Sequence, residues 1–240
     1  MTQISIIIPT FNELKNGYLE KSLELLSELK NELSMEVIVV DSHSTDGTRD
    51  LLSQFQVTVL DCDTNSRAKR LNKGIMASNS NCLLLHHPRS LLTREGVLAL
   101  ATSYDKYTWG GFSHKFDYRH VLLNFTSWYS NKVRGMKKGI IYLDHCIFIN
   151  LNKVSKKTCI VNEVDVFEDI YLSKQLRKVS MPIILGYPST TSAARFVKNG
   201  IYKQAALNQL LKICFTLGVS EKNMNMVYEK GLNFNSKYQK

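Results

Sequence analysis

The sequence predicts an α/β fold with a mostly parallel central sheet that is covered by helices on both faces. Short apolar runs and amphipathic helical segments alternate through residues 1–104, which is the pattern of consecutive βαβ units. Right-handed crossovers in such units place the strands parallel within one sheet. Ligands of these sheets bind outside the carboxyl ends of the strands, so the residues that follow each strand are the candidates for a site.

The expected elements of the first half follow one another in order. Residues 4–8, ISIII, form a continuous β-branched run that ends at Pro9, which is typical of a buried strand. Leucines then recur at helical spacing from Leu19 to Leu33 and predict an amphipathic helix. The other expected strands are 36–41, 57–60 and 82–86, and the other expected helices are 44–55, 66–78 and 93–104.

The pattern changes after residue 105. Residues 109–118 are expected to form an exposed antiparallel strand, and a helix at 167–178 opens with Glu168 and Asp169, acids that suit a first helical turn. The remaining expected elements are a helix at 120–134, a strand at 143–150 and two final helices at 200–217 and 220–231. Since no linker interrupts the chain, residues 1–240 are expected to form one domain with a C-terminal helical annex.

Composition and charge restrict the class of protein. The N-terminus lacks the features of a signal peptide, no stretch reaches the roughly 20 apolar residues of a membrane span, and the five cysteines show no C-x-x-C spacing. We therefore expect a cytoplasmic protein. Residues 1–120 carry a net charge of −1, whereas residues 121–240 carry +11. The basic half favours anionic partners, but we expect no nucleic-acid binding because no recognition motif is present.

The helix expected at 200–217 has one apolar face. We expect this face to pack on its own domain, and favour that over peripheral contact with an anionic membrane. Its members are Ile201, Ala205, Leu207, Leu211 and Phe215, and Lys203 and Lys212 are expected to point away from it.

Several short motifs resemble a known family. The glycine-rich signatures of dinucleotide and P-loop sites are absent. Instead, the motifs SIIIPTFNE, VIVVDSHSTDGT and EDIYLSKQL resemble the family 2 glycosyltransferases of GT-A fold. The motifs SRAKRLNKGIMAS, LLLHHPRS, LDHCIFI and TSAARF are similar to a small bacterial subgroup of that family, the arsenosugar-biosynthesis or selenodomain-associated glycosyltransferases.

The resemblance implies an enzyme that transfers a sugar from a nucleotide-diphosphate sugar to an acceptor hydroxyl with inversion, and it does not name the acceptor. Residues 1–104 would be the nucleotide-binding half, residues 105–199 the acceptor half, and residues 200–240 the C-terminal helices. Asp169 matches the catalytic base, Asp41 the acid that binds base and ribose, and Glu13 its nucleotide-side partner. The other expected nucleotide-binding residues are Pro9, Thr10 and Arg67, and the expected acceptor-side residues are Asp144, His145 and Glu168.

The end of the fourth strand departs from the family pattern. The family has an acidic D-x-D motif there, or its relic, which holds a divalent metal against the donor diphosphate; this chain has His86, His87, Pro88 and Arg89. Three interpretations of this departure remain open. In the first, Arg89 replaces the metal. In the second, His86, His87 or His145 hold a softer metal such as Mn²⁺ or Zn²⁺ with Asp144. In the third, the chain is a non-catalytic homologue that binds nucleotide sugars. We rank a weak or absent metal site first, with Mn²⁺ or Mg²⁺ as the alternative.

Overall fold

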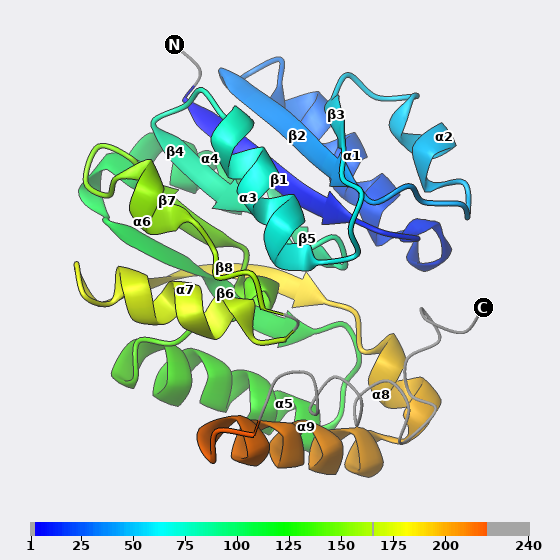
Figure 1. Ribbon diagram of the computed structural model, residues 1–240, viewed down its shortest axis with the longest axis vertical. Helices are drawn as coiled ribbons and strands as arrows, with labels where there is room; N and C mark the ends of the chain where they lie inside the picture. Colours follow the sequence, from blue (N-terminus) through cyan, green and yellow to red (C-terminus); the bar gives the residue numbers. More distant parts are fainter. Residues whose placement is uncertain (1–2, 165, 220–240) are drawn as a thin grey trace.

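The computed structural model describes residues 3–164 and 166–219 and contains an eight-stranded mixed sheet (Figure 1). The strand order is β3-β2-β1-β4-β7-β6-β8-β5. The first four strands in this order are parallel to one another, as the alternation of the first half predicts. They are β1 (Ile4–Thr10), β2 (Met35–Asp41), β3 (Thr58–Asp61) and β4 (Cys82–Leu85).

Helices cover both faces of this sheet because alternate residues of its strands point to opposite sides. Ile6 and Ile8 pack with the leucines of α1 (Tyr18–Leu29) and with α4 (Arg94–Ser103). Ile7 lies on the other face and packs with α3 (Arg67–Ala77). The short elements of this half are η1 (Leu14–Asn16), α2 (Thr48–Leu52), β5 (Ser90–Leu92) and η2 (Tyr104–Lys106).

The second half corrects two expectations about strands. The strand expected at 109–118 is mostly buried and not exposed, because β6 (Trp109–Phe116) lies inside the sheet. Its antiparallel pairing is confirmed with β7 (Ile147–Asn150), but β6 also pairs in parallel with β8 (Ile183–Thr191). The expected strand at 143–150 is shorter, since residues 143–145 form the 3₁₀ turn η4 (Leu143–His145) and Cys146 has a positive φ of 50°.

Two strands were not predicted. In β8, Gly186 and Pro188 interrupt the apolar pattern, and the pairing with β6 shifts register between Phe112 and Ser113. β5 has only three residues, too few for a periodic signal.

The remaining helices lie beyond the antiparallel part of the sheet (Figure 1). α5 (Val121–Trp128) continues as a π-helical segment, η3 (Tyr129–Lys137). α7 (Glu168–Leu176) covers the same face as α3. The others are α6 (Lys156–Cys159), α8 (Ala194–Asn199) and α9 (Ile201–Thr216). No helix within residues 3–164 and 166–219 is long and apolar enough to cross a membrane, and the expected helix at 220–231 lies outside the described residues.

The apolar face of α9 packs as expected through Leu207 and Leu211, which contact Val166 and Phe167. The side chain of Lys212 lines a cavity beside Tyr142, a position that the sequence does not predict.

Gly110 lies where β6 is paired on both sides, opposite Phe148 and Ile183. A Cβ at this position would overlap the carbonyl oxygen of Ile183 and lie 2.9 Å from the Phe148 ring. We expect Gly110→Ala to lower the free energy of unfolding by about 1–3 kcal/mol, as overpacking does, measured by urea denaturation. Gly186→Ala on β8 is the matched control, because no atom lies within 4 Å of its added Cβ. Equal stability of the two variants would contradict this account of the sheet.

Candidate active site

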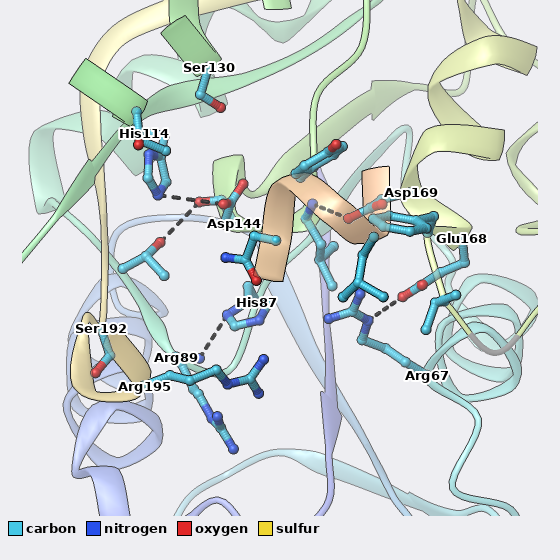
Figure 2. Close-up of a pocket in the computed structure, with 18 of the residues that line it drawn as sticks. Arg67, His87, Arg89, His114, Ser130, Asp144, Glu168, Asp169, Ser192 and Arg195 are labelled. Atoms are coloured by element: carbon cyan, nitrogen blue, oxygen red, sulfur yellow. Dashed lines mark hydrogen bonds and ion pairs between the residues drawn. The ribbon is translucent and has the colours of Figure 1, made fainter. Parts of the chain in front are cut away.

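A cavity of about 430 Å³ opens beyond the carboxyl end of β4, where the sequence places the ligand crevice (Figure 2). Its walls come from the loop after β4, the start of α3, the η4 turn, the start of α7, and helices α8 and α9. Both halves of the chain therefore contribute to it. Six of the predicted site residues line it: Arg67, His87, Arg89, Asp144, Glu168 and Asp169.

One side of the cavity is cationic. Figure 2 shows Arg89 and Arg195 on the same side of His87, opposite the acids of α7. The Nε atom of Arg89 donates to Glu13 Oε2 at 2.7 Å, and Glu13 is only 3% exposed. The Glu13 carboxylate thus fixes the direction of the Arg89 guanidinium at the end of β4. The cations that line the cavity are Arg67, Arg70, Arg89, Arg134, Arg195 and Lys212.

The opposite side carries two carboxylates in the first turn of α7. Phe167 precedes them with a φ of 61°, a left-handed conformation that is rare for a bulky residue and turns the chain into the helix. Glu168 forms an ion pair with Arg67 of α3. Asp169 Oδ2 accepts a hydrogen bond from the Leu143 backbone N–H at 3.0 Å. These contacts hold Asp169 at the cavity wall while Glu168 is bound to Arg67.

The surroundings of Asp169 change its acidity. Burial, and then the neighbouring charge of Glu168, raise the pKa of Asp169 to about 6, although Arg67 and the Leu143 N–H act against the rise. Burial disfavours the charge of Arg67, but Glu168 and Asp169 outweigh it and raise its pKa further above its usual value. Asp169 is therefore ionised at neutral pH and still basic enough to accept a proton.

Asp144 lies on the η4 turn beside two buried histidines. Its Oδ2 is 3.5 Å from His114 Nε2, and its Oδ1 is 3.9 Å from His145 Nε2. Burial lowers the pKa of His145 to about 3, so this ring is neutral. Burial would raise the pKa of Asp144, but His114, His145 and Arg134 outweigh it and hold that pKa well below the usual range. Asp144 is thus a charged group at the cavity wall whose Oδ1 has no hydrogen-bond donor among the described residues.

The structure places other predicted residues behind the cavity wall. Pro9, Thr10, Glu13 and Asp41 are buried, and none of them lines the cavity. Asp41 is 0% exposed and accepts hydrogen bonds from Thr10 Oγ1 at 2.8 Å and from the Ser44 backbone N–H at 2.8 Å. These contacts join the ends of β1 and β2. The nucleotide-binding roles of Pro9, Thr10, Glu13 and Asp41 stay predictions.

Two predicted histidines are also buried away from the cavity. Burial lowers the pKa of His86 to about 4. His145 is bonded to Ser130 Oγ at 2.9 Å and to the Phe112 carbonyl at 2.9 Å. The buried side chain of His145 therefore anchors the η4 turn to β6 and η3.

Sequence reasoning missed several cavity residues. Arg195 belongs to the TSAARF motif, which was a signal that could have found it. His114, Arg134 and Lys212 carry no local signal, because β6, η3 and α9 come together only in the tertiary structure.

The donor set around the end of β4 does not fit the divalent metal that the family implies. Hard cations such as Mg²⁺ or Mn²⁺ prefer clustered oxygen ligands. Here Arg89 lies beside His87, and the buried carboxylate of Glu13 is bonded to Arg89. Residues 3–164 and 166–219 contain no group of three or more His, Cys, Asp or Glu side chains arranged to hold a metal ion. We therefore derive no step through a metal.

The sheet, its covering helices and the position of the cavity define a fold of the GT-A type. The chain belongs to glycosyl transferase family 2, whose model matches residues 5–144. None of the curated proteins matches the chain.

Solved structures share the fold at low sequence identity. S. aureus TarS 1-349 in complex with UDP-GlcNAc is 19% identical, with a TM-score of 0.61 over 79% of this chain and 58% of that chain. The mannosyltransferase PcManGT from Pyrobaculum calidifontis, in complex with GDP-Man and Mn²⁺, is 18% identical, with a TM-score of 0.55 over 80% of this chain and 56% of that chain. Glucosyl-3-phosphoglycerate synthase from Mycobacterium tuberculosis is 13% identical, with a TM-score of 0.55 over 79% and 71%. The chain thus spans only 58% of the length of the TarS chain.

The raised pKa of Asp169 makes stability depend on pH. In the folded state this pKa is about 6, against an ordinary value of 3.8, so folding favours the protonated carboxyl. As pH rises from 4 to 7, the free energy of unfolding of the wild type should fall relative to that of Asp169→Asn. The fall should be at most about 3 kcal/mol. Denaturation curves of both proteins across this range measure the difference, and pH 4 is the internal reference. If the difference in free energy of unfolding between the two proteins stayed constant with pH, the raised pKa of Asp169 would be contradicted.

Proposed function

We propose that the protein transfers a sugar from a nucleotide-diphosphate sugar to an acceptor hydroxyl with inversion at the anomeric carbon. One observation carries the proposal: a single cavity holds Asp169, a buried carboxylate whose pKa is raised to about 6, opposite a wall of arginines. A base and a site for negative charge are the two groups that this reaction requires. In this proposal the nucleotide of the donor lies against residues 1–104, Arg195 reaches its diphosphate from the second half, and the acceptor hydroxyl approaches from the side of residues 105–199.

Asp169 acts as the general base in this proposal. Its carboxylate takes the proton of the acceptor hydroxyl while the acceptor oxygen attacks the anomeric carbon. The new carbon–oxygen bond forms on the face opposite to the diphosphate, and the bond to the diphosphate oxygen breaks with its electron pair remaining on that oxygen. Inversion follows from this geometry. The ion pair between Glu168 and Arg67 holds the first turn of α7 and so positions the base.

The arginines stabilise the leaving diphosphate. Arg89 and Arg195 approach one region of the cavity from the loop after β4 and from α8 (Figure 2). A guanidinium meets phosphate oxygens with two parallel N–H groups and keeps its charge at every physiological pH. The resemblance aligns Pro88 and Arg89 with the acidic metal motif of the family, which supports a role for Arg89 in place of a metal. The donor class is supported by TarS and PcManGT, structures of the same fold that contain UDP-GlcNAc and GDP-Man.

Two finer assignments rest on the sequence alone. The LLLHHPRS, LDHCIFI and TSAARF motifs support membership in the arsenosugar-biosynthesis or selenodomain-associated subgroup. The cysteine pattern supports a cytoplasmic location.

Asp169→Asn should lower sugar transfer by roughly 10²- to 10⁴-fold, because the amide keeps the shape of the carboxylate and removes its basicity. Donor binding should stay within about twofold, since the base contacts the acceptor and not the diphosphate. Release of nucleoside diphosphate measures the rate, and calorimetry measures donor binding. Near-normal transfer by the variant would remove Asp169 as the base. A wild type that binds donors but neither transfers nor hydrolyses them would favour the non-catalytic homologue.

Arg89→Ala should weaken the binding of nucleoside diphosphates by roughly 10- to 100-fold, the usual effect of losing a hydrogen bond to a charged group. Binding of the corresponding nucleoside should change much less. Arg89→Lys keeps the charge beside Glu13, so it distinguishes loss of phosphate contact from loss of the fold. Arg94→Ala is the matched control, because Arg94 pairs with Glu32 outside the cavity. Equal losses for nucleoside and diphosphate would contradict the role of Arg89.

A further inference from the structure

A second, larger cavity lies beside the candidate active site. It has a volume of about 1140 Å³ and is a groove between α5 and η3 on one side and α7 and α9 on the other. Figure 1 shows α9 running alongside α5. The two cavities share Thr126, Arg134, Tyr142 and Lys212. The groove therefore leads to the site that holds Asp169, and nothing in the proposed reaction uses it.

The walls of the groove are apolar with cations placed along them. Its apolar lining residues include Leu122, Phe125, Ile140, Ile170, Ala205 and Phe215. Arg134, Lys138, Lys174 and Lys212 also line it, whereas no carboxylate does among the residues that the structure describes. This combination suits a ligand with an apolar chain and a negative charge.

The cations gather where the two cavities meet. The Arg134 guanidinium carbon lies 3.4 Å from the centroid of the Tyr142 ring, and Lys212 Nζ lies 5.9 Å from the same centroid. Two cations thus flank one aromatic ring at the junction. Burial and the neighbouring Arg134 lower the pKa of Lys212 to about 8, although Asp144 opposes the change. An anion bound at the junction would relieve this repulsion.

The outer edge of the groove carries an exposed apolar ridge on α5, formed by Val121, Phe125 and Trp128. These side chains are 84%, 56% and 53% exposed, and the rings of Phe125 and Trp128 lie 5.7 Å apart. The spacing of the three residues places them on one face of the helix. Phe125 also lines the groove, so the ridge is continuous with it.

The charge of the surrounding chain matches an anionic bilayer. Lys132 and Lys137 lie on η3, Lys138 directly follows it, and residues 121–240 carry a net charge of +11. Exposed aromatic side chains beside lysines are the composition of helices that lie in a membrane interface. Basic residues near an anionic bilayer are attracted by its negative surface potential.

We propose that the acceptor is an anionic, hydroxyl-bearing lipid at a membrane surface, with its chain in the groove between α5 and α9 and its charged head beside Arg134 and Lys212. The α5 ridge contacts the bilayer, and the groove guides the head group toward Asp169. The acceptor role rests on the proposed function: the lipid hydroxyl gives its proton to Asp169, its oxygen bonds to the anomeric carbon, and the nucleoside diphosphate leaves. Lipid binding itself does not depend on that reaction.

Co-sedimentation with vesicles tests the site. The full chain should sediment with vesicles of phosphatidylglycerol, whose head carries both phosphate and hydroxyl groups, and at least tenfold less with vesicles of phosphatidylcholine. The double variant F125S/W128S should weaken the association with phosphatidylglycerol by about tenfold or more. Lys138→Gln with Lys174→Gln should reduce the preference for the anionic vesicles. Met76→Ser with Val179→Ser is the matched control, because both side chains are exposed and neither lines a cavity.

The outcomes separate this inference from the proposed function. Calorimetry of the same proteins measures donor binding, which F125S/W128S should leave unchanged. Donor binding without vesicle association would overturn the inference and leave the proposed function intact. Vesicle association without donor binding would keep the lipid site but overturn the role of the lipid as acceptor. A self-associating chain that binds no vesicles, and becomes monomeric in F125S/W128S, would identify a second copy as the partner of the ridge and overturn the proposal.

Discussion

The ion pair between Arg67 and Glu168 joins the two halves of the molecule at the candidate site. Arg67 begins α3, which covers the parallel strands, and Glu168 begins α7, which belongs to the second half. Glu168 is buried and the Arg67 side chain is 37% exposed, so the pair contributes little net stability, because the cost of removing Glu168 from water offsets the attraction. The ion pair matters because it positions α7 and places a charge beside Asp169. It fixes the first turn of α7, and the Glu168 carboxylate within it raises the pKa of Asp169 against the effect of Arg67.

Two residues with positive φ direct the acids into the cavity. Phe167 has a φ of 61° immediately before Glu168 and Asp169, and Cys146 has a φ of 50° just after Asp144 and His145. Such conformations cost about 1–2 kcal/mol for residues other than glycine. The surrounding contacts hold the η4 turn in place, because the Asp144 carbonyl accepts a hydrogen bond from Ser189 Oγ at 2.6 Å. Backbone strain of this kind is typical of functional sites, and here it lies beside the acidic residues of both turns.

The sequence predicted the parallel half of the fold and the acids of α7, and it missed features that depend on tertiary contacts. Continuous β-branched runs mark β1 and β2 because both faces of these strands are buried. β8 lacks such a run, since Gly186 and Pro188 interrupt it. The motif around Asp41 did not predict that this carboxylate accepts hydrogen bonds from Thr10 and Ser44, because those contacts depend on the pairing of β1 with β2. Lys212 reaches the cavity only because α9 packs through Leu207 and Leu211.

The central claim is that burial and Glu168 keep Asp169 as a base that titrates near neutrality. A ¹³C NMR titration of the side-chain carboxyls, with the Asp169 signal assigned from Asp169→Asn, tests it without any substrate. The account predicts a midpoint of about 6 in the wild type. It also predicts a lower midpoint in Glu168→Gln, because that substitution removes the like charge and releases Arg67 from its partner. A midpoint near 3.8 in the wild type, or an unchanged midpoint in Glu168→Gln, would contradict it.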